Sequence, residues 1–312
     1  MIGRAVVTGG AGFVGSHLVD RLVDEGCETL VVDDLSTGRL DNLAQARRSQ
    51  RMAFHQIDIR DQNLTEVVSN YRPEVVFHLA AQASVALSVE DPATDASINI
   101  VGTVNVLSAA LAAGARKMVN ITTGGALYGS EAPLPTSERA KQAPDSPYGI
   151  SKKATLDYLK HFKKDYGLDF VSVAPSNIYG PRQDPHGEAG VVAIFVQQFL
   201  DHQTPVIYGD GSITRDYVYV EDVVDALMRG SESGSGRLFN IGTGLETSVL
   251  ELYRRLASIT GFSGEPEFGP DRPGDVPRSC LDAANASKHL GWEPFTALEA
   301  GLRLTVEWYK SR

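Results

Sequence analysis

Short runs of apolar, mostly β-branched residues alternate with longer amphipathic stretches through the first half of the chain. The runs predict strands at residues 5–8, 29–33, 53–57, 75–78, 117–121 and 169–174, and the stretches predict helices at residues 13–25, 62–71 and 96–113. Apolar strands that are each followed by a helix indicate a parallel sheet with both faces covered. The pattern therefore predicts an α/β fold with a doubly wound (Rossmann) parallel sheet.

The alternation loosens after about residue 175. Helices are expected at residues 191–203, 221–230, 248–260 and 297–310, with short strands near residues 206–208 and 217–220. We predict a dinucleotide-binding domain of residues 1–175 and a smaller α/β substrate-binding region of residues 176–312, with some segments returning to the first domain. Ligands of open α/β sheets bind at the carboxyl ends of the strands, so the second region is expected to close over that edge.

Composition and charge limit the partners. Of 312 residues, 42% are hydrophobic and 22% charged, which suffices for a full core. The net charge of −10 offers no basic surface for a nucleic acid or a membrane, so we expect neither partner. Cys27 and Cys280 fit neither a disulfide framework nor a metal site. With no apolar leader in the sequence, these features predict a cytoplasmic protein without a metal.

A glycine-rich loop follows the first predicted strand. Gly9, Gly12 and Gly15 allow a tight turn and let backbone amides approach a pyrophosphate at the start of the next helix. Asp33 ends the second predicted strand, where its carboxylate would accept hydrogen bonds from the adenosine ribose and repel a 2′-phosphate. The sequence therefore predicts a site for NAD rather than for NADP.

A tyrosine and a lysine lie four residues apart in a predicted helix. Ser146 and Pro147 suit the cap and the first position of that helix, so Tyr148 and Lys152 share one face. A phenol has an ordinary pKa of about 10, and lowering it by about three units needs roughly 4 kcal/mol of differential stabilisation. A neighbouring ammonium favours the phenolate in this way. We predict that Tyr148 is the base of a redox enzyme and Lys152 its electrostatic partner.

These motifs resemble the extended short-chain dehydrogenase/reductase family, and they are most similar to its bacterial UDP-glucose 4-epimerases. The resemblance covers essentially the whole chain. It is carried by Asn99 and by residues 9–17, 33–38, 78–81, 128–129, 148–152, 175–182, 209–217 and 272–275. The later segments are typical of nucleotide-sugar enzymes rather than of the superfamily at large.

The resemblance implies an NAD-dependent isomerase of galactose metabolism. In that family the base takes the proton of the sugar C4 hydroxyl while C4 gives its hydride to NAD, and the 4-keto sugar turns over before the hydride returns. A homodimer is also implied, paired through the helices near residues 96–111 and 154–162, although those faces would equally suit burial within one chain.

The resemblance also implies the site residues. The catalytic residues are Tyr148, Lys152 and Thr123. The cofactor-binding residues are Gly9, Gly12, Phe13, Val14, Gly15, Asp33, Asp34, Ser36, Thr37, Gly38, Asp58, Ile59, Leu79, Ala80, Ala81, Gln82, Asn99, Thr122, Tyr148, Lys152 and Pro175. The residues for the UDP-sugar are Ser84, Thr123, Tyr148, Asn177, Val191, Val192, Val206, Tyr208, Arg215, Arg272, Asp275 and Ser279. Arg215 and Arg272 suit the diphosphate because a guanidinium forms bidentate bonds to phosphate oxygens.

Two positions depart from the family pattern or refine it. Family members place a serine or threonine at the position of Gly124, so Thr123 is the candidate for the hydroxyl that bridges the substrate and Tyr148. Ser279 lies where enzymes restricted to plain hexoses carry a bulky aromatic residue. A small residue there predicts activity on UDP-N-acetylglucosamine as well as on UDP-glucose.

Other functions were weighed on the same residues. A 4,6-dehydratase typically has an Asp-Glu pair, and a decarboxylase a glutamate, at the positions of Gly124 and Gly125, so both are disfavoured. A UDP-uronic acid 4-epimerase stays open. A non-catalytic NAD-binding sensor would be expected to lose Tyr148 or Lys152, and the chain has both.

Overall fold

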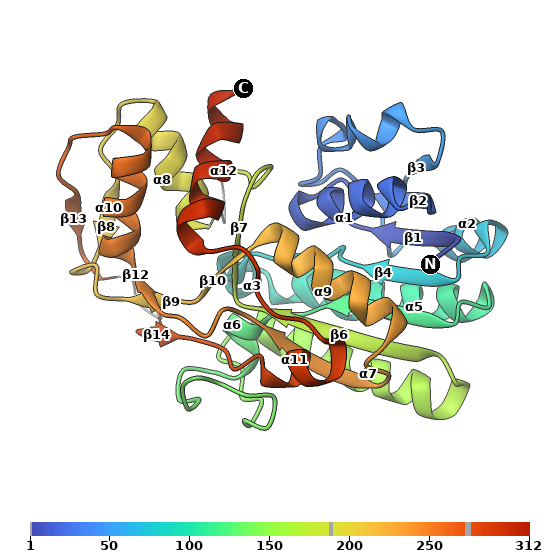
Figure 1. The fold of residues 1–312 in the computed structure, drawn as a ribbon. Coiled ribbons are helices and arrows are strands. Elements are labelled where there is room, and N and C mark those ends of the chain that lie inside the picture. The colour runs from blue at the N-terminus through green and yellow to red at the C-terminus, as the bar shows by residue number, and fades with distance from the viewer. Residues whose placement is uncertain (1, 187–189, 272–275) are drawn as a thin grey trace.

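A seven-stranded parallel sheet forms the centre of the molecule (Figure 1). The computed structural model describes residues 2–186, 190–271 and 276–312. The strand order is β11-β6-β5-β4-β1-β2-β3. The strands are β1 (Arg4–Thr8), β2 (Glu28–Asp33), β3 (Met52–Gln56), β4 (Val75–His78), β5 (Lys117–Ile121), β6 (Asp169–Pro175) and β11 (Arg237–Ile241). The order reverses between β1 and β4, which is where dinucleotides bind in doubly wound sheets. The predicted fold class is confirmed.

Alternate residues of each strand face opposite layers of the core. Val7 of β1 and Phe77 of β4 pack in one cluster, and their neighbours Val6 and Val76 pack in the other. All four are buried. A strand covered on both faces is apolar throughout its length, and for this reason the sequence pattern identified the inner strands.

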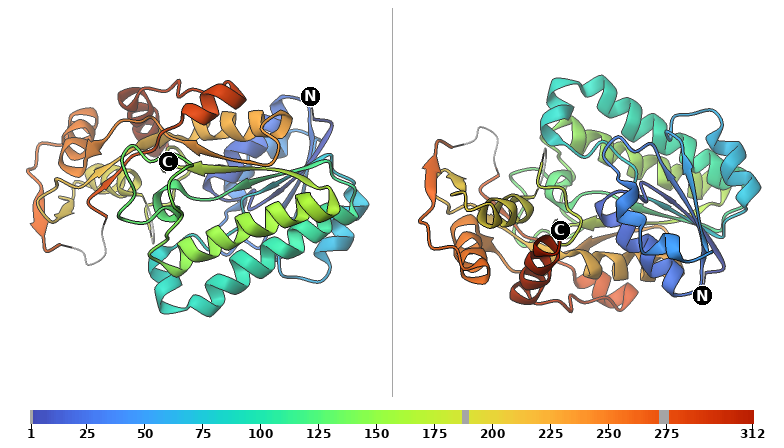
Figure 2. Two further views of the ribbon diagram at one scale, coloured as in Figure 1. Left: turned by 90° about the horizontal axis from the view of Figure 1, so that it is seen from below. Right: turned by 90° about the horizontal axis from the view of Figure 1, so that it is seen from above.

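Helices cover both faces of the sheet. On one face, α1 (Phe13–Asp24) packs against α9 (Val220–Glu232), which also contacts β5 and β6. On the other face α5 (Gly102–Ala112) lies between α2 (Leu64–Tyr71) and α7 (Pro147–Tyr166). Figure 2 shows α5 and α7 running side by side. Short helices complete this part, namely η1 (Leu40–Leu43), η2 (Ala46–Arg48), α3 (Val85–Glu90) and α6 (Gly124–Leu127).

The helix expected at residues 96–113 begins earlier and is not uniform. It comprises α4 (Pro92–Ala96), a π-helical segment η3 (Ser97–Val101) and α5. By length and composition alone the span Pro92–Ala112 would suffice to cross a membrane. It instead packs along α2 and α7 as a helix of the sheet's outer layer. Core helices of globular proteins commonly have this composition.

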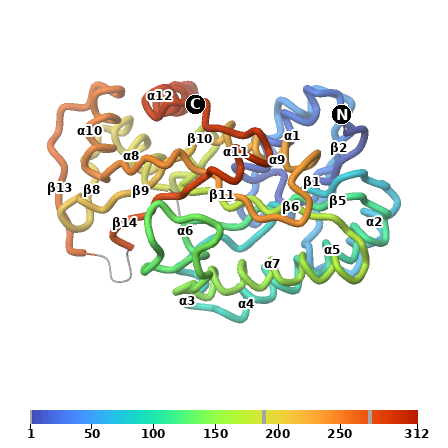
Figure 3. The backbone as a smooth tube through the Cα atoms, turned by 60° about the horizontal axis from the view of Figure 1, so that its bottom comes forward, coloured from blue at the N-terminus to red at the C-terminus, as the bar shows by residue number. Residues whose placement is uncertain are grey.

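The seventh strand was not predicted. β11 pairs in parallel with β6, and Phe239 in its centre is fully buried. In Figure 3, β11, α9 and α11 (Ala284–Leu290) lie with the sheet, away from α8 (Val191–Leu200) and α10 (Val249–Thr260). Segments beyond residue 175 therefore contribute to the sheet layers. The division into two domains at that residue stays a prediction.

The remaining elements build a smaller α/β region beside the sheet. Helices α8, α10 and α12 (Leu298–Lys310) contact one another around a separate apolar core that includes Phe195, Phe199 and Leu252. Its strands are β7 (Asn177–Tyr179), β8 (Val206–Tyr208), β9 (Thr214–Arg215), β10 (Tyr217–Tyr219), β12 (Thr247–Ser248), β13 (Glu267–Gly269) and β14 (Arg278–Ser279). These strands form three small sheets.

Candidate active site

The glycine-rich loop joins β1 to α1 and leaves no room for side chains. A Cβ atom on Gly15 would lie 2.1 Å from the Gly9 carbonyl oxygen, and one on Gly9 would lie 2.5 Å from the Ala80 amide nitrogen. Gly9 also has a φ of 70°, in the left-handed region that favours glycine. The N-cap of α1 is Gly12, which has no side chain to cap the helix. The first amides of α1, at Phe13 and Val14, are therefore available to an anion.

Asp33 lies beside this loop at the end of β2. Its carboxylate accepts hydrogen bonds from the amides of Ala11 and Leu35, each at 2.9 Å, and burial raises its pKa. A Cβ on Gly38 would lie 2.6 Å from Asp33 Oδ1, so glycine is needed there. The neighbouring Asp34 accepts from the Ser36 amide and hydroxyl and shapes the turn.

The other predicted cofactor residues line the same edge of the sheet. Asp58 follows β3 and pairs with Arg60, which lowers the pKa of its carboxyl. Pro175 is the last residue of β6. The rest follow the ends of β2, β3, β4 and β5, or lie in η3, and comprise Thr37, Ile59, Leu79, Ala80, Ala81, Gln82, Asn99 and Thr122. Thr122 Oγ1 is buried without a hydrogen-bond partner among the described residues.

Tyr148 and Lys152 meet Thr123 at the carboxyl end of β5. Thr123 is the N-cap of α6, where its hydroxyl accepts from the Ala126 amide at 3.2 Å, and it also hydrogen-bonds Tyr148. Lys152 Nζ lies 6.0 Å from the Tyr148 ring centroid and donates to the Ile121 carbonyl at 3.4 Å. Ser146 caps α7 as predicted, accepting from the Gly149 amide, with Pro147 at the first helical position.

Burial opposes ionisation of both members of the pair. It raises the pKa of Tyr148 to about 12, while the hydrogen bond from Thr123 lowers it. Burial lowers the pKa of Lys152 to about 8. A base with a pKa near 12 is protonated at neutral pH, so the phenolate requires a positive charge beside it. The cationic nicotinamide of an oxidised cofactor and the Lys152 ammonium would together provide that charge.

The structure explains the glycine at position 124. A Cβ there would lie 2.3 Å from Leu281 Cδ1 and 3.0 Å from the Pro175 carbonyl oxygen. A larger residue here would displace the end of the Leu281 side chain and press on the Pro175 carbonyl, so the position is tightly packed. The Thr123 hydroxyl hydrogen-bonds Tyr148, and its role as the bridging hydroxyl stays a prediction.

The predicted substrate residues lie on the smaller region and at its junction with the sheet. Arg215 Nη1 donates to the carbonyls of Thr214 and Val276, at 2.8 and 2.7 Å. Ser279 of β14 pairs with Arg215 of β9. Asn177 is exposed at the start of β7, and Ser84 is the N-cap of α3. Arg272 and Asp275 lie outside the described residues.

Four of these residues lie on α8 and β8. Val191 is partly buried at the start of α8, and Val192 is buried in the apolar core of the smaller region. Val206 and Tyr208 are exposed on β8. Beyond Tyr208, an open hollow of about 790 Å³ is lined by Gly209, Asp210, Ser212, Ile213, Phe268, Gly269, Pro270 and Asp271.

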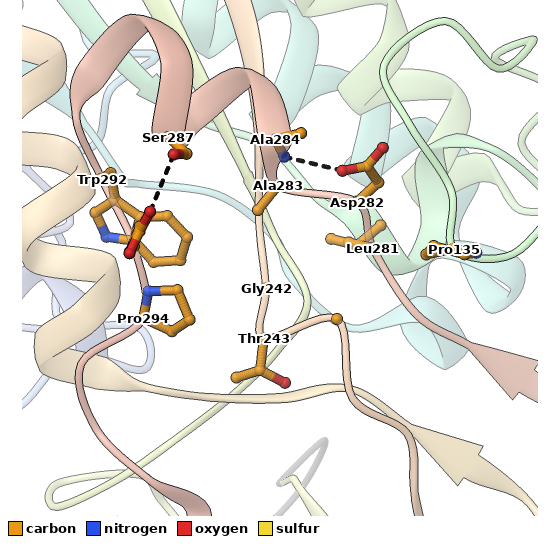
Figure 4. Close-up of a pocket in the computed structure, with 12 residues that line it drawn as sticks. Pro135, Gly242, Thr243, Leu281, Asp282, Ala283, Ala284, Ser287, Trp292 and Pro294 are labelled. Carbon is orange, nitrogen blue, oxygen red and sulfur yellow. Dashed lines mark hydrogen bonds between the residues drawn. The ribbon is translucent and has the colours of Figure 1, made fainter.

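A second hollow, of about 290 Å³, lies between α11 and the loop after β11 (Figure 4). Trp292, Leu281 and Thr243 line it, and Ser287 donates to Glu293 at its rim. It contains none of the predicted site residues. The chemistry of the proton-transfer pair therefore belongs to the sheet edge rather than to this hollow.

The sheet edge fits NAD in three respects. The glycine cradle and uncapped α1 suit a pyrophosphate. The Asp33 carboxylate suits ribose hydroxyls and disfavours a 2′-phosphate. Thr122, next to Thr123 in the chain, has a buried hydroxyl without a hydrogen-bond partner among the described residues, as expected where a ligand supplies one.

Comparison with known proteins decides the family. The family described as GDP-mannose 4,6 dehydratase matches residues 6–305. The chain belongs to this family, the epimerases and dehydratases among the extended short-chain dehydrogenases/reductases. A UDP-glucose 4-epimerase of Mycolicibacterium smegmatis is 50% identical over 99% of each chain.

Solved structures of family members match closely. UDP-glucose 4-epimerase of Thermotoga maritima, solved with UDP-glucose, is 47% identical over 99% of both chains, with a TM-score of 0.95. The Thermus thermophilus UDP-glucose 4-epimerase complex with NAD is 41% identical, covers 98% of this chain and 99% of its own, and has a TM-score of 0.90. The family resemblance seen in the sequence is confirmed.

Some residues of the site were not singled out from the sequence. Asp95 of α4 is buried and accepts hydrogen bonds from Gln82 and Asn99. Asp216 is buried and binds the loop after β11 through the amides of Thr243 and Gly244. The four-residue spacing of Asp95 and Asn99 suits one helix face, although the predicted helix began only at residue 96.

The cradle geometry yields a testable prediction. Gly15→Ala places a Cβ against the Gly9 carbonyl, so we expect NAD affinity to fall at least about tenfold, or about 1.4 kcal/mol. NAD retained per chain after gel filtration, and titration of stripped protein, measure this. Gly26→Ala is the control, because Gly26 has a positive φ but no atom within 4 Å of its Cβ. Equal retention by Gly15→Ala and the wild type would refute the cradle.

Proposed function

We propose that this protein is a UDP-glucose 4-epimerase that interconverts UDP-galactose and UDP-glucose at a bound NAD. The observation that carries the proposal is the Thr123–Tyr148–Lys152 cluster, set at the carboxyl end of β5 beside the glycine cradle. The family is NAD-dependent, and relatives of this name match along the whole chain.

The chain's own residues hold and move the proton. The glycine cradle and Asp33 would hold NAD, which would supply the acceptor and donor for the hydride of the sugar C4. Tyr148 takes the proton of the C4 hydroxyl and later gives it back, and Thr123 bridges its phenol to the sugar oxygen. Lys152, as a buried cation, stabilises the phenolate. The attraction between the two charges is stronger in a low-dielectric site than in water.

The nucleotide end would lie across the smaller region. Arg215 and Arg272 are proposed for the diphosphate, with Asp275 on the uridine ribose and Asn177 near the sugar. Tyr208 is proposed to stack near the uracil, and its exposure on β8 next to the larger hollow supports this placement.

Dehydration of the sugar fits the site poorly. It requires an acid and a base beside the tyrosine, at the positions of Gly124 and Gly125. Both positions are glycine, so neither group is present, and a Cβ on Gly124 would lie only 3.0 Å from the Pro175 carbonyl oxygen. Epimerisation needs only the single proton donor and acceptor that Tyr148 provides.

The proposed function is tested by product analysis. We expect the purified protein with NAD to convert UDP-galactose to UDP-glucose without net NADH, as separated by anion exchange. A sensor would give no product. Conversion of UDP-uronic acids alone would move the assignment to a uronic acid 4-epimerase.

Thr123 generates a prediction on turnover. Thr123→Ala removes the hydroxyl that contacts Tyr148, so we expect kcat to fall about 10²-fold. Thr123→Ser is the matched control, because it keeps both the hydroxyl and the cap of α6, and it should retain most activity. Loss of the α6 cap should lower the free energy of unfolding by about 1 kcal/mol. Thermal denaturation measures this loss of stability separately from the loss of turnover. Wild-type turnover by Thr123→Ala would remove the hydroxyl from the mechanism.

Ser279 generates a prediction on specificity. A small side chain beside Arg215 supports acceptance of a 2-acetamido group, so we propose activity on UDP-N-acetylglucosamine. Ser279→Tyr should lower the ratio of kcat/KM for the N-acetylated sugar over that for UDP-glucose, by about tenfold for a group of this size. Ser279→Ala should leave the ratio near that of the wild type. An unchanged ratio in Ser279→Tyr would contradict the pocket argument.

We further infer a homodimer and a cytoplasmic location. Exposed apolar side chains gather on α3, η3 and α7, at Leu87, Val89, Val101, Ile150 and Tyr158. Light scattering should then give about twice the chain mass of 33.6 kDa, and a single chain mass would contradict the dimer. Buried free Cys27 and Cys280 support the location, which fractionation of the source cells would test.

A further inference from the structure

Residues 180–183 follow β7 and form a turn, here called the β7 turn, that is attached to the side of α1. His17 and Asp20 of α1 lie three residues apart and therefore on one face of the helix. Both are buried, with 8% and 7% of their surface exposed. Asp20 Oδ2 accepts a hydrogen bond from Arg182 Nη2 at 2.6 Å, and His17 Nε2 lies 2.9 Å from the Pro181 carbonyl oxygen. Two side chains of α1 thus bind two consecutive residues of the β7 turn.

These contacts involve charged groups that are largely shielded from water. The side chains of Arg182 and Asp20 are 14% and 10% exposed. Burial raises the pKa of Asp20, and the charge of Arg182 opposes that rise. His17 Nδ1 also lies 2.7 Å from Glu221 Oε1 at the start of α9, so the ring connects α1 to two other segments. Breaking a buried ion pair from one side leaves an uncompensated charge, whereas a solvated surface pair contributes little.

The backbone of the β7 turn has an uncommon conformation. Arg182 has a φ of 69°, in the left-handed region that residues with side chains rarely adopt. Such a conformation persists only where the surrounding contacts fix it. Asp20 binds the Arg182 side chain, and one residue later Tyr309 of α12 donates a hydrogen bond to the Gln183 carbonyl. The β7 turn is therefore held between α1 and α12.

The β7 turn also contacts two segments that carry predicted substrate residues. Gln183 Nε2 donates to the carbonyl of Ile178, the residue after Asn177, at 3.2 Å. A Cβ on Gly190, the residue before Val191, would lie 2.7 Å from the same nitrogen. Asn177 and Val191 are both predicted to bind the UDP-sugar. A displacement of the β7 turn would therefore shift both segments.

We propose that Asp20 and His17 are positioning residues that hold the substrate-binding segments at a fixed place relative to the cofactor helix. The N-terminus of α1 adjoins the glycine cradle for the pyrophosphate, and one face of the same helix binds the β7 turn. One helix thereby sets the spacing between the bound cofactor and the UDP-sugar. The proposal rests on the proposed function for the identity of the substrate.

Asp20→Asn tests the contact between α1 and the β7 turn, because it removes the charge and keeps the shape of the side chain. In the NAD-loaded protein we expect amide hydrogen exchange across residues 178–183 to become about tenfold faster, the lower end of the cost of a lost hydrogen bond to a charged group. Mass spectrometry of the peptide that contains these residues measures the exchange. His17→Leu, which keeps bulk and removes both ring contacts, should give the same change if the asparagine variant folds poorly.

Substrate binding gives a second readout. Asp20→Asn should raise the KM for UDP-galactose about tenfold, for the same reason. The kcat should change little, because the Tyr148–Lys152 pair on α7 is untouched. NAD retained per chain should equal that of the wild type, because the cradle glycines are unchanged. A loss of kcat or of NAD with KM unmoved would indicate general destabilisation and would overturn the proposal.

Glu25→Gln is the matched control. Glu25 pairs with Arg21 on the same helix, but both side chains are exposed, at 40% and 44%, and the pair stays within α1. Its replacement should leave the exchange of residues 178–183 and the KM unchanged. Unchanged exchange or an unchanged KM in Asp20→Asn would overturn the proposal.

The proposal and the proposed function fail in different ways. Absence of epimerase activity in the wild type would refute the proposed function alone. Amide exchange does not depend on turnover, and the dissociation constant of UDP, measured by calorimetry, would then replace the KM. An equal dissociation constant for UDP in Asp20→Asn and the wild type would again overturn the positioning role.

Discussion

Burial of the Lys152 amino group at the end of β5 is the constraint on which the site depends. Only 6% of the residue is exposed, and its ammonium meets the Ile121 carbonyl rather than water. Such a group stays charged only if the surroundings supply negative charge or oriented dipoles. The Ile121 carbonyl, to which Lys152 Nζ donates, supplies one such dipole. A Cβ on Gly149 would lie 2.4 Å from the Ala126 carbonyl, so this glycine lets α7 approach α6 closely.

The buried Asp216 carboxylate connects the smaller region to the central sheet. Asp216 follows Arg215, is fully buried, and accepts from the Thr243 amide at 2.9 Å and from its hydroxyl at 2.7 Å. Because Thr243 follows β11, this links the strand that carries Arg215 to the edge of the central sheet. Arg215, which is proposed for the diphosphate, is therefore held at a fixed position relative to the central sheet that carries the proposed cofactor residues.

The sequence predicted the parts of the molecule that local chemistry determines. The inner strands, the cradle at Gly9 and Gly15 and the capped start of α7 follow from apolar runs, glycine spacing and a Ser-Pro pair. β11 was missed because residues 237–241 are few and lie among glycines and serines, so its pairing with β6 depends on tertiary contacts. Asp95 was missed because a polar pair in a helix is usually solvated, and only packing against α7 buries it.

The central claim is that the hydride removed from the sugar C4 returns to the same carbon within one active site, while Tyr148 accepts and donates the proton. UDP-galactose carrying deuterium at C4 tests this directly, by mass spectrometry and NMR of the UDP-glucose formed in ordinary water. The account predicts full retention of deuterium at C4 and none elsewhere. Hydrogen from the solvent at C4, with loss of the label, would contradict it.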